Sequence, residues 1–498
     1  MSRHTFLPGL IVLALTGCTL GPDFEKPASP DLPAQFDSHG AAEAAKPAPD
    51  AWWTLFNDAE LTRLEQRVVA ANLDIQVAAH HLAQSRLEVR IAKADLLPQA
   101  EGNINVTHEA QSAQGVVSLL GGSGSQGTAF NGAGGTTNGV PSSPASPLTQ
   151  PINLYQYGFD ASWEIDLWGR VQRGVEATQA AADVSADQAH DVLITAQAEL
   201  ARDYLQLRGA QTQIALLNQR LATQSQRLAL VQQRAQGGLA TAQEVADERS
   251  RFASLAAQLP DLKDQESRAM NAIAELLAAP PGALQGELAA GQALPPSPPD
   301  LPVGLPSELT RRRPDIRAAE AQLHAATAEI GVAIADFYPR LTLSGSAAIQ
   351  ALQPHELDEW SARTFGFGPG ISLPIFEGGV LKRRLELRKD EQQEAALRYR
   401  RTVLAALHEV DDAMSSLASA QRRQDQLDQA TKDSGASFDL TRARFDAGVD
   451  DKLAVLDAQS RQLAAEQASA DSRVARATVV VQLYKSLGGG WQSLPEQH

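Results

Sequence analysis

Cysteine is almost absent from this sequence, since its 498 residues contain a single one, Cys18. One cysteine cannot form a disulfide within the chain, and it cannot build a cysteine-based metal site alone. Aromatic residues are also scarce, at 5% of the chain. Ala, Gln, Leu, Arg, Glu and Asp dominate from about Val171 onward. This composition favours long helices over an aromatic-rich globular core.

Positive net charge is missing as well, because the formal charge is −16 at pH 7. Nucleic-acid binding needs a basic face that releases counterions from phosphates, so nucleic acid is excluded as a partner. The sequence has no phosphate-binding Gly-Lys-Ser/Thr loop, so the chain cannot use ATP itself. It also shows no clustered nucleophile or metal-ligand set. We therefore expect neither an enzyme nor a metal site.

Long hydrophobic runs are absent too. Residues 1–17 carry a basic Arg3, an apolar run from Phe6 to Leu15 and small residues, which is typical of an export signal peptide. That run is too short to span a hydrocarbon core of ~30 Å, and no later segment offers ~20 apolar residues. Any membrane-spanning part must therefore be a β-barrel.

The segment Leu15-Thr-Gly-Cys18 resembles the bacterial lipobox. The resemblance implies that Cys18 becomes the first residue of the mature protein and carries a covalent lipid, with no other cofactor expected. Thr19 follows in place of Asp, which implies sorting to the outer membrane and contact with outer-membrane lipid. The alternative is a signal peptide that happens to end on a cysteine.

The rest of the chain is an internal duplication. The stretch from Asn72 to Pro98 aligns without a gap with Arg313 to Pro339, and further on the offset falls to about 210. The expected organisation is a signal peptide (1–17), an N-terminal tether and equatorial segment (18–60), repeat 1 (61–280), a proline-rich linker (281–306), repeat 2 (307–488) and a C-terminal tail (489–498).

Each repeat has two stretches of alternating polarity that predict two strands. The clearest stretch runs from Tyr155 to Leu167, and the others lie around Ile104, Leu341 and Phe367. Four strands are too few for a membrane barrel, so several chains must share one. The aromatic residues expected at the membrane rim are Tyr155, Tyr157, Trp163, Trp168 and Phe376. A soluble two-sheet core is the alternative.

Proline is absent between Pro151 and Pro260 and between Pro374 and Pro495, which permits long helices. Leucines or isoleucine recur every seven residues from Leu200 to Leu228, as in a coiled coil. We expect helices over about 171–236 and 380–447, each ~100 Å long at ~1.5 Å per residue. Gly238 and Gly448 would end these helices at a turn, after which an antiparallel helix completes each hairpin.

Specific motifs then identify a family resemblance. The most specific are Leu305 to Ile316, Ala335 to Pro339, Pro374 to Gly379 and Leu483 to Trp491. Together with the lipobox, they resemble the TolC-like outer-membrane efflux factor family, in particular its lipoprotein (NodT-type) branch. The resemblance implies a mainly α fold: a long coiled-coil helical barrel with a trimeric twelve-stranded β-barrel, four strands coming from each protomer.

The same resemblance implies a function and partners. The chain would be the passive, gated exit duct of a tripartite multidrug efflux pump, working as a homotrimer with a periplasmic adaptor (membrane fusion) protein and an inner-membrane pump of the RND type. Asp457 matches the family's constriction aspartate, and the repeat places Asp247 at the corresponding site. Asp450 and Arg444 lie at the same tip. A solvated helix surface is the alternative role for these residues.

Other functions remain open at this stage. The duct could instead export polypeptides or metal ions, because the lining of a passive tunnel need not encode its cargo. A periplasmic adaptor would also be an exported lipoprotein with helical hairpins. It would need compact β-domains in place of the alternating strand from Tyr155 to Leu167.

Overall fold

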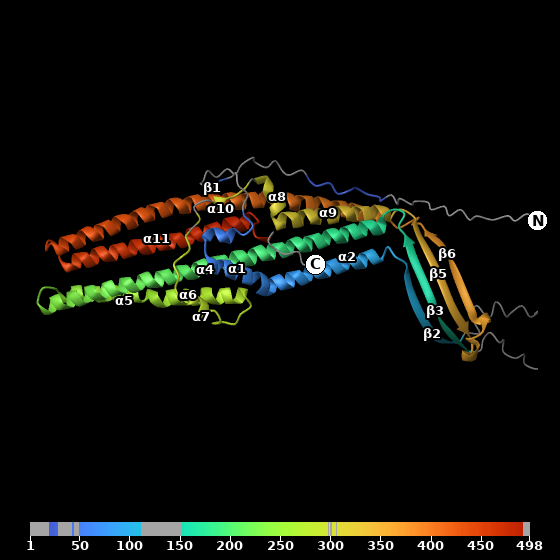
Figure 1. Ribbon diagram of the computed structural model, residues 1–498. Helices are drawn as coiled ribbons and strands as arrows, with labels where there is room; N and C mark the ends of the chain where they lie inside the picture. The colour runs from blue at the N-terminus through green and yellow to red at the C-terminus, as the bar shows by residue number, and fades with distance from the viewer. Residues whose placement is uncertain are drawn as a thin grey trace, which may run out of the picture. The chain divides into compact units, whose positions relative to one another are not determined.

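The computed structural model describes residues 19–27, 42–43, 49–110, 151–296, 298, 301–304 and 306–491 (Figure 1). Cys18, the expected site of lipid attachment, therefore lies outside the described residues, as do most of the C-terminal tail and the Gly/Ser-rich segment from Gly115 to Pro147. Contacts between Cα atoms divide the chain into two compact units. One comprises 1–22, 90–175 and 329–387, and the other comprises 23–89, 176–328 and 388–498.

The element order repeats itself as the sequence predicts. In the first half the elements are η1 (Trp52–Phe56), α1 (Ala59–Ala71), α2 (Leu73–Ala94), β2 (Gln99–Glu109), β3 (Ile152–Ile165), α4 (Arg170–Gln236), α5 (Ala242–Ala256), α6 (Gln258–Leu276) and α7 (Gln285–Leu288). In the second half they are η3 (Pro306–Glu308), α8 (Leu309–Arg312), α9 (Pro314–Ala335), β5 (Arg340–Ala351), η4 (Pro354–Glu356), η5 (Trp360–Ala362), β6 (Arg363–Ser372), α10 (Val380–Asp446) and α11 (Lys452–Ser486). A short parallel pair, β1 (Ala42–Glu43) with β4 (Leu301–Pro302), joins the tether to the linker between the halves.

The two long helices match the expected ones closely. Both α4 and α10 contain 67 residues, and α2 and α9 contain 22 each. The predicted ends, at residues 236 and 447, lie within one residue of the observed ends. The prediction of a mainly helical fold built from two similar halves is confirmed.

The hairpin of the first half differs from that of the second in its return helix. In the second half, α11 runs unbroken, whereas α5 and α6 are separate helices that meet at Ala257. Pro260 is the third residue of α6 and has no N–H to donate, which a helix tolerates only within its first turn. A single return helix was expected here, and this proline explains why there are two.

Strands β2, β3, β5 and β6 form one antiparallel sheet in that order. The four strands of this sheet, two from each half of the described chain, confirm the predicted number. The alternation extends further along the sequence than the strands do, because β3 ends at Ile165 and β6 at Ser372. Leu167 and Ile375, which continue the alternation, are therefore not strand residues, contrary to expectation.

One face of this sheet is apolar and exposed. Ile104, Phe365 and Phe367 are 84%, 79% and 89% exposed, and no other element of the described chain covers them. Two tryptophans, one in β3 and one in the turn after it, donate hydrogen bonds to the segments that lead into neighbouring strands. Trp163 Nε1 donates to Leu96 O at 2.9 Å, and Trp168 Nε1 donates to Pro339 O at 2.8 Å.

The main hydrophobic core belongs to the second unit. It combines η1 and α1 with the middle of α4, α10 and the end of α11, and Trp52 stacks on Tyr484 with ring centroids 5.8 Å apart. Leu200 and Leu207 of the predicted coiled-coil repeat are fully buried there. No helix among the described residues is both long enough and apolar enough to cross a membrane.

Candidate functional site

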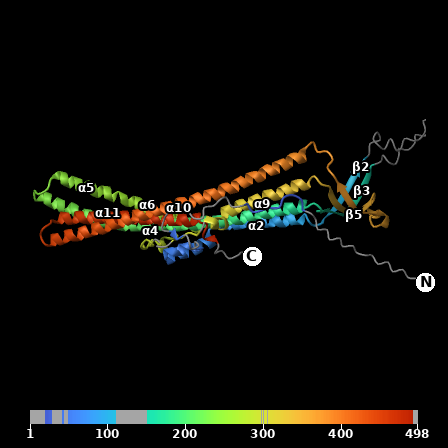
Figure 2. The same cartoon turned by 90° about the horizontal axis from the view of Figure 1, so that it is seen from above.

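Both hairpins of the second unit end in the glycine turn predicted from the sequence (Figures 1 and 2). Gly238 and Gly448 have φ angles of 75° and 74°, a left-handed conformation that favours glycine. Leu239 N donates to Arg234 O and Val449 N to Arg444 O, each over five residues, as in a Schellman motif. The two turns are thus local structures of the same kind.

The return helices begin with side-chain caps. Thr241 and Glu244 form a complete capping box at the start of α5. Asp451 caps α11, and its carboxylate accepts from Ala454 N at 2.9 Å. The two N-cap residues, Thr241 and Asp451, are counterparts in the repeat, but only Asp451 has a charged side chain. It is therefore available for a second, electrostatic contact.

Arg227 of α4 joins the two hairpins. Its Nη1 atom forms an ion pair with Asp457 of α11, and its Nε lies 2.9 Å from Glu248 Oε1 of α5. The Asp457 side chain is 46% exposed, whereas that of Glu248 is 7% exposed. Gln224 Nε2 also donates to Glu248, at 2.6 Å. Glu248 thus positions Arg227, while Asp457 forms the contact between hairpins.

A second ion pair between the hairpins lies closer to the turns. Arg234 Nη1 is 3.1 Å from Asp451 Oδ2. Arg444, the counterpart of Arg234 in the repeat, instead pairs with Asp450 of its own turn through two hydrogen bonds of 2.8 and 3.0 Å. Position 240, which corresponds to Asp450, is an alanine, so Arg234 has no equivalent partner in its own turn.

The structure brings the candidate constriction residues to the same end of the hairpins, but in different environments. Asp457 is paired with Arg227, Asp450 is paired with Arg444, and Asp247 is exposed. Their role as a pore constriction stays a prediction, because a single chain has no pore axis. Arg227 differs from Arg444 in that its partner Asp457 lies on the other hairpin.

Sequence reasoning missed Arg227, Arg234 and Glu248. A signal for the first two was present, because Gln213, Arg220, Arg227 and Arg234 follow one another at intervals of seven residues. Such spacing places polar side chains on one stripe of a helix that faces a partner. Because all four residues are polar, an apolar heptad pattern does not include this stripe.

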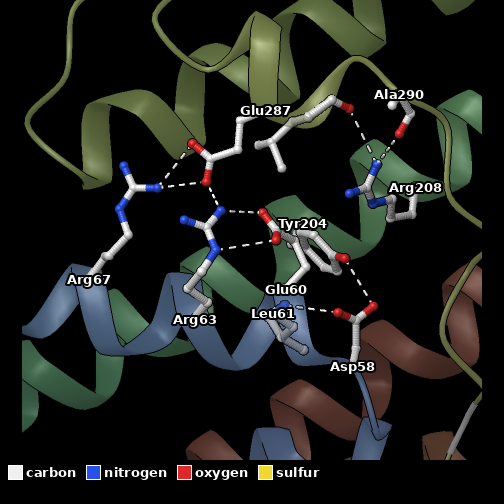
Figure 3. A network of polar contacts seen from close by, with 10 residues as sticks. Asp58, Glu60, Leu61, Arg63, Arg67, Tyr204, Arg208, Glu287 and Ala290 are labelled. Atoms are coloured by element: carbon white, nitrogen blue, oxygen red, sulfur yellow. Dashed lines mark hydrogen bonds and ion pairs between the residues drawn. The ribbon is translucent and has the colours of Figure 1, made fainter.

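A polar network fixes the linker between the two halves against α1 and α4 (Figure 3). Asp58 caps α1 by accepting from Leu61 N at 2.9 Å, and it also accepts from the Tyr204 hydroxyl at 2.9 Å. Arg67 binds both carboxylate oxygens of Glu287, at 2.8 and 3.1 Å. Burial raises the pKa of Tyr204 to about 12, so its hydroxyl remains a donor at neutral pH.

Arg208 completes this network and lies against the ring of Tyr204. Its side chain is fully buried, and its guanidinium lies 5.0 Å from the centre of the Tyr204 ring. Nη1 donates to the carbonyl oxygens of Leu288 and Ala290, at 3.3 and 3.1 Å. The linker backbone is thus held by a buried cation, which fixes where the second half begins.

Comparisons with known proteins agree with this architecture. The family model described as "Outer membrane efflux protein" matches residues 64–279 and 305–489. The chain belongs to the outer membrane efflux protein family. It is 32% identical over 446 residues to the pyoverdine export outer membrane protein OpmQ of Pseudomonas aeruginosa, covering 89% of this chain and 88% of OpmQ.

Two further comparisons cover nearly the whole chain. The toluene efflux pump outer membrane protein TtgF of Pseudomonas putida is 30% identical over 510 residues, covering 100% of this chain and 99% of TtgF. The solved structure of the outer-membrane channel OprN has a TM-score of 0.80 at 31% identity, covering 95% of this chain and 100% of OprN. The protein is therefore an outer-membrane exit duct of an efflux pump, with the fold of TolC-like channels.

Proposed function

We propose that the protein works as a homotrimeric, gated duct that receives drugs from an RND-type inner-membrane pump through a periplasmic adaptor. It performs no chemistry of its own, and the pump supplies the energy. In this proposal Cys18 carries the lipid that anchors the chain to the outer membrane.

The sheet supports the trimer. Strands β2 and β6 are its edges, and within the described part of the chain neither has a second strand partner. In lipid, unpaired backbone N–H and C=O groups cost several kcal/mol each, so an open edge is not tolerated. Three copies would supply twelve strands and close the sheet. The exposed apolar face would then meet lipid.

The hairpin ends support the gate, and the single observation that carries it is the pair of ionic contacts between hairpins. Arg227–Asp457 and Arg234–Asp451 join α4 to α11 within the last turns before the glycines. Contacts at the free ends of long helices resist separation of the hairpins while leaving the rest of the helices unchanged. An adaptor that competes for these charges would open the duct.

In this proposal the pump and the adaptor, rather than the duct, select the cargo. By their names, OpmQ exports pyoverdine and TtgF belongs to a toluene pump, although both resemble this chain to a similar degree. Such different cargoes on similar ducts indicate that the pump and the adaptor select the substrate. We favour drug-like molecules because the lipoprotein motifs resemble those of multidrug systems.

The test combines the native mass of the purified, lipidated protein with its current in a planar bilayer. We expect a trimer with a small resting current that increases when Arg227 and Arg234 are both replaced by methionine. A monomer that passes no current would contradict the proposal. A trimer whose resting current is already as large as that of the double variant would contradict the gate alone.

A further inference from the structure

The exposed apolar face of the sheet contains a hollow near the link between β5 and β6. Its volume is about 280 Å³, and it is lined by three residues from each of β3, β5 and β6. In the register of the sheet, Ala347 lies between Phe159 of β3 and Phe365 of β6. Alternate residues of a strand point to the same face, so two aromatic rings rise on either side of a single methyl group. We call this site the Ala347 hollow.

The walls of the Ala347 hollow are open to their surroundings. The side chains of Phe159 and Phe365 are 70% and 79% exposed. Strands β3 and β6 are two strand spacings apart, or ~9.5 Å, and the three lining residues of each strand extend over ~7 Å. A hydrocarbon chain that lies along the strands between the two rings suits these dimensions.

The duplication shows that the floor of the hollow is particular to the second half. Tyr157 and Phe365 are counterparts, because each is followed by Gly-Phe. The register sets Ile104 opposite Tyr157, whereas it sets Ala347 opposite Phe365. An isoleucine in the first half therefore occupies space that the alanine leaves open in the second half.

A positive charge borders the hollow at the end next to the link between β5 and β6. The guanidinium carbon of Arg363 lies 4.3 Å from the centre of the Trp360 ring. Among the described residues, no carboxylate forms an ion pair with Arg363. Glu356 and Glu359 in the link accept hydrogen bonds from other residues. The counterpart of Arg363 in the first half is Tyr155, so this charge is also particular to the second half.

The position of Arg363 along the sheet places it in the outer leaflet of the membrane. Helix α9 leads into β5 at Arg340 and α10 follows the end of β6 at Ser372, and these two residues pair with each other. Arg363 pairs with Ile349 at the opposite end of the same two strands. In the proposed duct the helices extend into the periplasm, so this opposite end faces outward. Trp360 beside Arg363 fits a membrane–water interface, where tryptophan is enriched.

We propose that the Ala347 hollow binds one lipopolysaccharide molecule of the outer leaflet, with an acyl chain between Phe159 and Phe365 and a phosphate of the headgroup on Arg363. The inference rests on the proposed duct, which gives the sheet its place in the membrane. An apolar hollow bordered by an unpaired cation selects a ligand that is both apolar and anionic. The planar guanidinium can donate two parallel hydrogen bonds to a phosphate. Lipopolysaccharide is the phosphorylated lipid of this leaflet.

The lipid expected on Cys18 would enter the other leaflet. Leu20, two residues further on, donates to Trp168 O at 3.1 Å, and Trp168 lies beyond the end of β3 that joins the helices. Each copy would thus contact lipid on both sides of the membrane. The two contacts together would fix the depth of the sheet in the bilayer.

The charge is tested by titrating the purified, lipidated protein with diphosphorylated lipid A, the acylated part of lipopolysaccharide, and counting bound lipid by native mass spectrometry. We expect saturation at one lipid A per copy. Arg363→Gln should weaken binding about fivefold, the effect of one arginine beside an anionic lipid surface. Removing the phosphates from lipid A should weaken binding to the unaltered protein by the same factor. It should leave binding to Arg363→Gln unchanged, because the phosphate then has no partner to lose.

The hollow is tested by giving its floor the residue that the first half has. Ala347→Ile adds a β-branched side chain that a strand accommodates well. It should weaken binding about tenfold, since the acyl chain loses the burial of about two methylene groups. Ala161→Ile is the matched control, because Ala161 lies on the same face but outside the lining of the hollow. Its binding should equal that of the unaltered protein.

Several results would overturn the inference. Unchanged binding in Arg363→Gln, or an equal loss in Ala347→Ile and Ala161→Ile, would show that lipid A does not occupy this site. Equal affinity for phosphatidylglycerol would overturn the assignment of lipopolysaccharide as the ligand. A trimer that conducts but retains no lipid A would overturn the site and leave the proposed duct intact. A monomer that passes no current would overturn the duct, and the inference with it.

Discussion

Replacing Arg227 by methionine removes one ionic contact between the hairpins and keeps much of the aliphatic stem. Arg227 binds Glu248 on its own hairpin and Asp457 on the other. Only the second contact resists separation of the hairpins. Because the Asp457 side chain is 46% exposed, water can solvate it after separation, and the pair contributes about 0.7 kcal/mol.

Three copies raise this contribution to about 2 kcal/mol for a concerted opening, which corresponds to about thirtyfold in an equilibrium constant. We therefore expect the ratio of fully open to closed time in single-channel recordings to rise about thirtyfold in Arg227→Met. Arg227→Lys, which keeps the charge but cannot reach Glu248 and Asp457 together, should give a smaller increase.

A double-mutant cycle isolates the pair from other effects of the substitution. Asp457→Asn alone should raise the open ratio to a similar degree. The double variant Arg227→Met with Asp457→Asn should then add little to either single change, because both remove the same interaction. Fully additive effects would refute the reasoning, since they would mean that the two side chains act independently.

Three further predictions concern stability. Asp58→Ala removes both the α1 cap and the acceptor of the Tyr204 hydroxyl and should cost about 2 kcal/mol, whereas Tyr204→Phe should cost about 1 kcal/mol; thermal unfolding of both variants measures the difference. Gly448 has a φ of 74° and open space around a new Cβ. Gly448→Ala should therefore lower the free energy of unfolding by about 1 to 2 kcal/mol through backbone strain alone. Gly237 has no positive φ, so Gly237→Ala should not destabilise the chain. Glu65→Gln should stabilise the protein at neutral pH and lose this advantage near pH 4.5. Thermal unfolding measured across that pH range tests this. Equal effects at both pH values would contradict the prediction.

The sign of the Glu65 effect follows from burial. The side chain is fully buried, and neither carboxylate oxygen has a hydrogen-bond partner within the described part of the chain. Desolvation raises its pKa well above the ordinary value of 4.5. The folded protein therefore holds a proton that the unfolded chain releases above pH 4.5. Stability from this group is complete below that pH and falls by up to about 1.4 kcal/mol per pH unit above it, until the folded pKa is reached.

Much of the fold could be predicted because the sequence is duplicated. Alignment of the two halves placed α4 and α10 within one residue of their ends, since helix periodicity and glycine turns are local signals. The ends of the strands could not be predicted in this way. Alternation continues to Leu167 and Ile375, but a strand ends where its neighbour no longer pairs, and Ile165 is the last residue of β3 with a partner on β5.

The candidate site was predicted only in part, for a related reason. Comparing the repeats draws attention to residues present in both, such as Asp247 and Asp457. Arg227 has a serine as its counterpart, so the comparison could not reveal it. The ion pair joins residues 230 positions apart, and only packing of α4 on α11 brings them together.

The measurement that tests the central claim most directly is the rate of drug efflux from cells that lack this gene, with and without a plasmid that restores it. Efflux should be lost in the deletion strain and recovered with the wild-type protein. Efflux that is equally fast in the deletion strain and the restored strain, for every drug that the pump carries, would contradict the account of this protein as the exit duct.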